Sequence, residues 1–277
     1  MGILYIVATP IGNLLDITHR AVQVLQTVDL IAAEDTRHSR PLLLHYGIQT
    51  KVLALHAHNE GSRSELLLQN LLQGQSIALI SDAGTPLISD PGYILVEAAR
   101  RKGIKVVPIP GPSAVITALS AAGLPTDKFI FEGFLPPKTG ARQKRLAELK
   151  VETRTLVFYE APHRILELFA DMIAVLGPDR HAVVARELTK QFETLHGDKL
   201  SALSAWLEAD PNQQRGEFVI LVKGYVPCQT DKLTSAEEVL RVLLTELPVK
   251  QAASLASRLT GAKKNELYQW ALANKPE

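Results

Sequence analysis

The sequence is poor in cysteine and in aromatic residues. Cys228 is the single cysteine among 277 residues, which excludes an intramolecular disulfide and a cysteine-based zinc site. It follows Pro227 at an expected domain edge without an activating neighbour, so we interpret it as inert. The histidines lack metal-ligand spacing: His56 and His58 lie in a segment that we interpret as a loop rather than a strand. We expect no metal.

Long apolar runs are also missing. No segment approaches the roughly 20 apolar residues that a membrane-spanning helix needs. The first residues, MGILYIVATPIGN, lack the basic stretch and small-residue cleavage site of a secretory signal. We therefore expect a cytoplasmic protein without a membrane partner. The formal net charge is +1, so bulk charge does not indicate nucleic-acid binding.

Positive charge is concentrated locally in residues 138–154. This run contains Lys138, Arg142, Lys144, Arg145, Lys150 and Arg154 against Glu148 and Glu152. A solvated helix face is the simplest explanation of such a run. A surface for a polyanion is the alternative that the motifs below make relevant.

Strand and helix patterns alternate through the first part of the chain. Strands are expected over 4–9, 29–34, 76–82 and 104–110, and helices over 16–28, 39–48, 62–75 and 93–103. Asp16 or Thr18 is the expected cap of the first helix, and Gly47, Gly74 and Gly103 end the others. This alternation predicts an α/β domain with a parallel sheet, residues 1–116.

A second α/β domain is expected over residues 117–226. A connector with a small-residue helix, 108–125, precedes it. Strands are expected over 129–136, 154–162, 181–189 and 216–225, with helices over 140–150, 163–176 and 198–208. The pattern favours a mixed sheet.

Residues 232–277 show no strand pattern. Helices are expected over 235–246, 249–260 and 263–274, with Ser235 and Glu238 as a capping box. A three-helix unit with a glycine turn before its last helix resembles a helix-turn-helix. Small helical bundles often share this pattern without binding anything, so nucleic-acid contact is a hypothesis.

Polar turns follow the expected strands. In the first half they are ATPIGN (8–13), AEDTRHS (33–39), SDAGTPLISDPG (81–92) and PGPSA (110–114); in the second, EAPHR (160–164) and ARELTKQFE (185–193). Ligands bind at the carboxyl edge of open α/β sheets, so these turns predict a cleft between the two domains. The acids of the second turn have a simpler explanation, because helix N-termini favour negative charge.

The order of these turns, with EGFLPP, FYEAPHR and GEFVILV, resembles the tetrapyrrole methylase superfamily. Within it, the chain is similar to the ribosomal RNA small subunit methyltransferase I branch over residues 3–270. The resemblance implies an S-adenosylmethionine-dependent enzyme that methylates a cytidine ribose 2′-hydroxyl in the decoding region of 16S rRNA. It also implies the ribosomal small subunit as partner, a homodimer, and an appended helix-turn-helix.

The same resemblance implies a donor site between the two domains. Its residues would be Pro10, Ile11, Gly12, Asp82, Gly84, Thr85, Pro86, Ile88, Ser113, Ala114, Tyr159, Glu160 and Leu188. The chain departs from pigment-methylating relatives, because ATPIGN replaces a glycine-rich first turn and GTP replaces GDP. The contacts of Thr9 and Thr85 therefore stay open.

A ribose hydroxyl is a weak nucleophile, so a carboxylate or imidazole should accept its proton. Asp35, Glu34 and His163, in that order, are the candidates, because the first two leave a strand edge beside the first turn. Position alone suggests cationic contacts to RNA phosphates. These candidates are Arg37, Lys144, Arg145, Arg164, Arg186, Lys190, Lys263 and Lys264.

Three other interpretations remain at this stage. A small-molecule pigment methylase would share the fold but needs neither the basic run nor the C-terminal helices. A DNA-binding regulator would use those helices without methyl transfer. Finally, the polar turns could be turns only.

Overall fold

A computed structural model describes residues 1–227 and 229–274, with the side chains of 229–235 excluded. The expected inertness of Cys228 and the side chain of Ser235 therefore lie outside the described residues. The chain forms two compact units, Met1–Gly224 and Tyr225–Glu277, and each is described by itself. No helix in the described part is long and apolar enough to cross a membrane.

The first sheet is parallel, as predicted. Its strands are β1 (Ile3–Val7), β2 (Leu30–Ala33), β3 (Val52–Ala54), β4 (Ile77–Ile80) and β5 (Lys105–Ile109), in the order β3-β2-β4-β1-β5. Strands β2 and β4 are buried throughout, as expected for a sheet covered on both faces. The edge strand β3 was not predicted, because three half-buried residues carry no periodicity.

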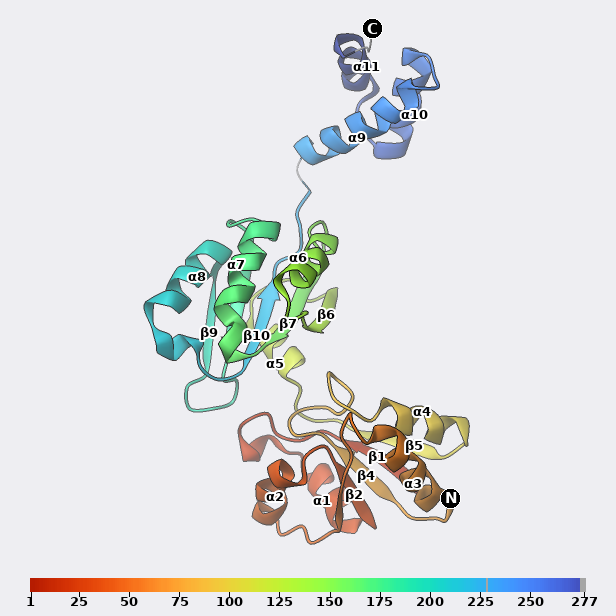
Figure 1. The fold of residues 1–277 in the computed structure, drawn as a ribbon, viewed down its shortest axis with the longest axis vertical. Helices are drawn as coiled ribbons and strands as arrows, with labels where there is room; N and C mark the ends of the chain where they lie inside the picture. Colours follow the sequence, from red (N-terminus) through yellow and green to blue (C-terminus); the bar gives the residue numbers. More distant parts are fainter. Residues whose placement is uncertain (228, 275–277) are drawn as a thin grey trace. The chain divides into compact units, whose positions relative to one another are not determined.

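Helices flank this sheet (Figure 1). They are α1 (His19–Thr27), α2 (Thr36–His45), α3 (Glu60–Leu72) and α4 (Tyr93–Arg101), followed by α5 (Ala114–Ala121). Thr18 caps α1 by accepting the Ala21 N–H, as predicted, whereas Asp16 ends a short 3-10 turn, Leu14–Asp16. The glycines expected to end α2, α3 and α4 all have positive φ.

The second sheet is mixed, as predicted. Its strands are β6 (Phe129–Phe134), β7 (Thr155–Glu160), β8 (His181–Arg186), β9 (Thr194–Lys199) and β10 (Phe218–Val222), in the order β6-β7-β10-β8-β9. Only β6 and β7 pair in parallel. The edge strand β9 was missed, because its sequence TLHGDK is mostly polar and exposed.

Helices α6 (Thr139–Glu148), α7 (Ile165–Leu176) and α8 (Leu200–Ala209) belong to this second half, with 3-10 turns at Pro162–Arg164 and Pro211–Gln214. Buried side chains of α7 and α8 pack with those of β7, β8 and β10 in one hydrophobic core. Because both sheets belong to the same compact unit, the division into domains 1–116 and 117–226 stays a prediction.

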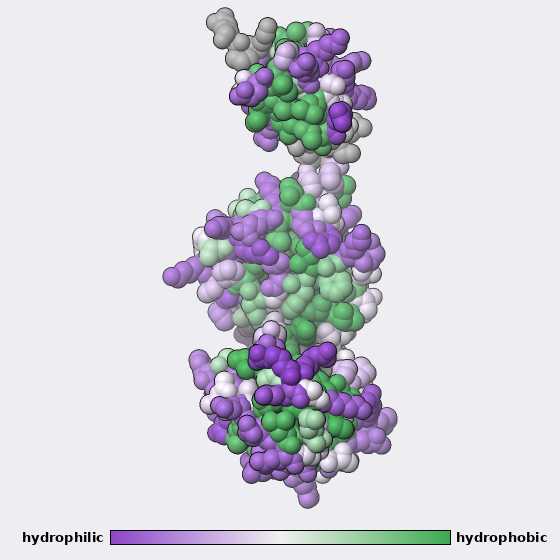
Figure 2. Space-filling model, turned by 90° about the vertical axis from the view of Figure 1, so that its right-hand side faces the viewer, coloured by the Kyte–Doolittle hydropathy of each residue, from purple (hydrophilic) through white to green (hydrophobic). Residues whose placement is uncertain are grey.

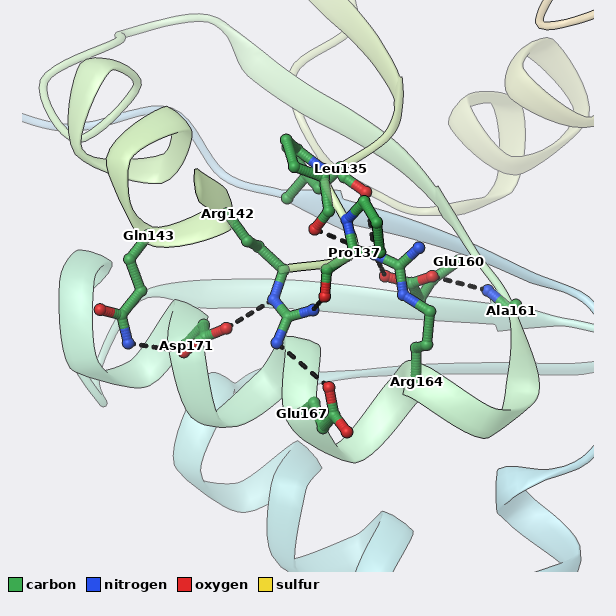
Figure 3. Close-up of polar contacts among 10 residues, drawn as sticks. Leu135, Pro137, Arg142, Gln143, Glu160, Ala161, Arg164, Glu167 and Asp171 are labelled. Carbon is green, nitrogen blue, oxygen red and sulfur yellow. Dashed lines mark hydrogen bonds and ion pairs between the residues drawn. The ribbon is translucent and has the colours of Figure 1, made fainter. Parts of the chain in front are cut away.

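The basic run 138–154 is not a uniformly solvated face. Arg142 is 1% exposed and is bonded to Asp171, Glu167 and the Pro137 carbonyl. Asp171 also accepts a 2.7 Å hydrogen bond from Gln143, which completes the network around Arg142 in Figure 3. Arg142 therefore joins α6 to α7 and contributes no charge to the surface.

Other cations of the run are also paired. Arg145 contacts Glu132 and Glu148 at 2.8 and 2.6 Å, and Arg154 contacts Glu152 at 2.7 Å. The exposed lysines of the run, Lys138, Lys144 and Lys150, carry its solvent-facing charge.

The C-terminal unit consists of α9 (Gln229–Leu244), α10 (Val249–Thr260) and α11 (Lys264–Ala273). Helix α9 begins six residues before Ser235, so the expected capping box does not mark its start. Helix α10 ends at Gly261 in the left-handed region, with φ 72°. Alanines of these helices form its core with Leu240 and Leu267. Hydrophobic surface is visible on this unit in Figure 2, and Leu259 is exposed.

Removing the buried partner of Arg142 should destabilise the first unit strongly. Asp171→Ala removes the buried carboxylate of the pair and leaves the desolvated guanidinium with the Pro137 carbonyl and the more exposed Glu167, and the loss of one partner of a buried pair typically costs about 3–5 kcal/mol. Asp179→Ala is the control, because its pair with Lys199 is exposed and should change stability little. Urea unfolding of both variants measures the difference. Equal midpoints would show that the buried pair contributes nothing.

Candidate functional site

Loop 81–92 is the structural centre of the carboxyl edge of the first sheet. Thr9 and Gly84 exchange backbone hydrogen bonds of 2.9 and 3.0 Å, which join it to loop 8–13. The Asp82 carboxylate accepts the Asp35 N–H at 2.9 Å. The Thr85 hydroxyl donates to the Pro112 carbonyl at 3.0 Å. The four polar turns of the first half therefore converge at this edge, as predicted.

The loop after β8 contacts the same edge from the second half. The Asn13 N–H donates to the Thr189 hydroxyl at 3.1 Å. A Cβ atom on Gly12 would lie 2.5 Å from Lys190 Cγ, so only glycine permits this approach without displacing the lysine. The turns of the two halves thus meet side by side.

A cavity of about 370 Å³ lies between these loops. Of the predicted donor residues it is lined by Ile11, Gly84, Thr85, Ile88, Ser113, Ala114, Tyr159, Glu160 and Leu188. Its volume falls in the range of small-molecule sites. Most of the residues predicted to contact the donor therefore line one cavity.

A second cavity, of about 340 Å³, shares Ile11, Ala83 and Glu217 with the first. The predicted residues Pro10, Gly12 and Asp82 line this second cavity instead, together with Lys190. His38 lies on it as well, with Nδ1 3.2 Å from the Asp82 carboxylate. Pro86 is buried and lines neither cavity.

Backbone strain is concentrated beside these cavities. In the described part of the chain, the non-glycine residues with positive φ are Leu87, Ser89, Glu187 and Thr189. Each belongs to loop 81–92 or to the loop after β8. Such conformations cost on the order of 1–3 kcal/mol each and cluster at ligand sites.

Glu160 places a buried carboxylate on the wall of the first cavity. Its Oε1 accepts the Ala161 N–H at 2.9 Å, while Oε2 has no hydrogen-bond partner and lies 3.3 Å from Arg164. Burial raises the pKa of Glu160 despite these neighbours. Arg164 itself donates to the Leu135 carbonyl at 2.8 Å (Figure 3). It therefore links Glu160, on the cavity wall, to the segment that follows β6.

The N-terminus of α5 faces the same cavity. Ser113 and Ala114 line it, and no side chain caps the first amides of this helix. Unsatisfied amides and the helix dipole favour an anion here, such as a carboxylate.

The predicted base candidates lie in different surroundings. Asp35 caps α2 by accepting the Arg37 N–H and pairs with the Arg37 guanidinium at 2.7 Å. These hydrogen bonds hold the pKa of Asp35 well below its usual range. Glu34 is half-buried; burial and the carboxylates of Asp90 and Asp82 raise its pKa. His163 is exposed. None of the three candidates lines either cavity, and their catalytic roles stay predictions.

The predicted RNA contacts differ in how much charge they leave available. Arg186 is 6% exposed and donates to the Arg215 and Phe192 carbonyls. Lys190 is paired with Glu187 and Glu217. Position at a strand end suggested phosphate contacts for both, but Arg186 is buried and its guanidinium is bonded internally. Arg37, Lys144, Lys263 and Lys264 are exposed, although Lys263 lies 3.3 Å from Glu266.

Several cavity residues were not singled out from the sequence. Ser89 and Asp90 line the first cavity from the second half of loop 81–92, which the sequence indicated as a ligand loop without a role for these two residues. Phe134 is 55% exposed and packs edge-on against Tyr159, with ring centroids 5.6 Å apart. In the sequence, only its place in the EGFLPP segment, which carries part of the family resemblance, indicated that Phe134 could belong to the site.

Comparison with known proteins agrees with this architecture. The model for tetrapyrrole (corrin/porphyrin) methylases matches residues 3–204, and the model for the RsmI C-terminal HTH domain matches 231–275. Ribosomal RNA small subunit methyltransferase I of Escherichia coli O157:H7 is 56% identical over 271 residues, 98% of this chain and 95% of the relative.

Solved structures share the fold at low identity. Diphthine synthase aligns with TM-score 0.64 and 16% identity, covering 83% of this chain and 93% of that one. Uroporphyrin-III C-methyltransferase from Thermus thermophilus, complexed with S-adenyl homocysteine, aligns with TM-score 0.56 and 17% identity, covering 79% and 97%.

The helix-turn-helix expectation for the C-terminal unit is confirmed by its family model. With full-length identity above one half and both models in sequence order, the chain belongs to the ribosomal RNA small subunit methyltransferase I family of the tetrapyrrole methylases.

Proposed function

We propose that the chain transfers a methyl group from S-adenosylmethionine to the ribose 2′-hydroxyl of a cytidine in the decoding region of 16S rRNA. The observation that carries this proposal is the first cavity. It is built by the loops that the family resemblance assigns to the donor, in a chain whose relatives are named small-subunit rRNA methyltransferases. A fold neighbour complexed with S-adenyl homocysteine supports the choice of donor.

The residues of the cavity suit such a donor. The uncapped amides at Ser113 and Ala114 would hold its carboxylate. The Oε2 of Glu160, which accepts no hydrogen bond within the chain, would accept one from a donor N–H or hydroxyl. Ile11, Leu188 and Tyr159 supply apolar walls. Each class of group on the donor thus finds a matching surface.

The donor, when bound, supplies an electrophilic methyl on a sulfonium sulfur. The chain must hold that methyl in line with the acceptor oxygen, and such positioning contributes up to roughly 7–11 kcal/mol in ideal cases. Loop 81–92 is suited to this task, because hydrogen bonds to three other turns fix it.

RNA would be held outside the cavity by exposed lysines. Lys144 on α6 and the pair Lys263 and Lys264 at the start of α11 are the strongest candidates, because they are exposed. In helix-turn-helix proteins the N-terminal residues of the second helix of the motif contact the nucleic acid, and α11 would be that helix here. Assembly as a homodimer, action on the assembled subunit and cytoplasmic location stay predictions.

The proposal is tested with radiolabelled S-adenosylmethionine and 16S rRNA from a strain that lacks this activity. Methylated 2′-oxygens block alkaline cleavage, so label should appear in alkali-resistant dinucleotides. RNA from the parent strain is the control and should accept little label. Label in a base, or none in RNA, would contradict the proposal.

The donor should bind a fragment of residues 1–224 as tightly as the whole chain. All residues of both cavities lie within the first compact unit, so the C-terminal helices should add nothing to donor affinity. Titration calorimetry on both proteins measures this. A folded fragment that fails to bind would mean that the tail helps to build the donor site.

Lys144→Ala should weaken RNA binding and reduce its salt dependence. Each lost phosphate contact should lower the log–log slope by about 0.7–0.9. Arg145→Ala is a matched comparison one residue along α6, and it should change the slope less, because Glu132 and Glu148 already neutralise that guanidinium. Filter binding across salt concentrations, with donor affinity as control, gives the slopes. Unchanged slopes in both variants would show that the basic run 138–154 is a solvated helix face that does not contact RNA.

A further inference from the structure

Asp90 is a carboxylate on the wall of the first cavity to which neither the sequence motifs nor the donor site gives a role. It lies in the second half of loop 81–92, beside Ser89, whose φ is 69°. Leu87, two residues before Ser89, has φ 74°. The chain therefore adopts two strained conformations immediately before it presents this carboxylate to the cavity.

The surroundings of Asp90 favour a carboxyl group that can exchange a proton. The groups that act on it are the Ser81 hydroxyl and the Asp82 carboxylate rather than a cation. Burial, with a smaller contribution from Asp82, raises the pKa of Asp90 to about 6. Two titratable groups on other elements feel the Asp90 charge, which raises the pKa of both: Glu34, beyond β2, and the Tyr159 phenol on β7, which lines the same cavity.

The other acids near the cavities are less suited to accept a proton. Asp35 is bound to Arg37 and has a lowered pKa. Glu160 lies at the cavity but is held by the Ala161 amide and lies beside the Arg164 cation. Glu34 lines neither cavity. Glu217 lines both cavities but is paired with Lys190 at 2.7 Å. Among the carboxylates named here, Asp90 alone combines a place on the first cavity with surroundings that hold no adjacent cation.

We propose that Asp90 is the general base that accepts the proton of the acceptor hydroxyl during methyl transfer. The inference rests on the proposed function above. The bond between the 2′-oxygen and the methyl carbon forms while the bond from carbon to sulfur breaks, and the sulfur keeps that electron pair. The hydroxyl proton moves to the Asp90 carboxylate, and water then removes it from the half-exposed loop.

The charges around Asp90 assist this transfer. Neutralising Asp90 relieves its repulsion with Asp82 and Glu34, so the protonated product of the step is favoured. A base with a pKa near 6 is still largely ionised at neutral pH, which general-base catalysis requires. The Ser81 hydroxyl favours the ionised form of Asp90 and so limits the rise of its pKa.

The test is Asp90→Asn in the full-length chain, assayed by single-turnover methyl transfer to 16S rRNA lacking the modification. We expect the rate to fall by at least about 100-fold, with donor and RNA affinities within threefold of wild type. The wild-type rate should rise with pH and level off above about 6, because the base must be deprotonated. The residual rate of Asp90→Asn should lack this inflection. Asp90→Glu, which keeps a carboxylate, should recover part of the rate.

Two comparisons make the result specific. Asp127→Asn removes an exposed carboxylate away from both cavities and should leave rate and pH profile unchanged. Asp35→Asn tests the first candidate from the sequence. It should keep the pH inflection, most of the rate and nearly the same thermal midpoint, since asparagine caps a helix about as well as aspartate and the Arg37 partner of Asp35 is exposed.

The outcomes separate the two levels of the proposal. A wild-type protein that labels no 2′-hydroxyl overturns the proposed function. An active wild type with a near-normal Asp90→Asn rate overturns only the base assignment. A loss of donor affinity as large as the loss of rate, with the inflection retained, makes Asp90 a donor ligand instead. Preserved circular dichroism and donor binding show that the variant is folded.

Discussion

The exchange of backbone hydrogen bonds between Thr9 and Gly84 is the constraint on which the site depends. It joins loops that follow β1 and β4, neighbouring strands of the first sheet, and so fixes loop 81–92 above the sheet edge. Gly84 meets this requirement with φ 80°, a conformation that glycine adopts at little cost. Ile11, two residues after Thr9, lines both cavities.

Much of the fold follows from sequence patterns, because long elements with a buried face leave a clear periodicity. The strands β1, β2, β4 and β5 and the caps around Thr18 and Gly103 were predictable in this way. Strand β3 was not, since only pairing with β2 makes three residues a strand. Strand β9 is likewise defined by pairing with β8 rather than by its own hydrophobicity.

The site was predictable in outline but not in the role of single side chains. Polar turns at strand ends indicated a cleft, and most residues that the resemblance implied do line one cavity. Charge alone was a poor guide to exposure: Arg142 and Arg186 look like surface cations in sequence but are buried among carbonyls and carboxylates. Sequence spacing shows neither the partner nor the depth of a charged group, and these decide whether it is structural or available to a ligand.

Loop 81–92 is held at its far end as well. The Glu60 carboxylate, on the first residue of α3, accepts the N–H groups of Gly92 and Ile94 at 2.9 and 3.1 Å and so caps α4 from another helix. Together with the bridge at Gly84, this makes the loop a span anchored at both ends. The backbone of the loop is thus tied at Gly84 and again at Gly92, and helix α3 serves as one of its two supports.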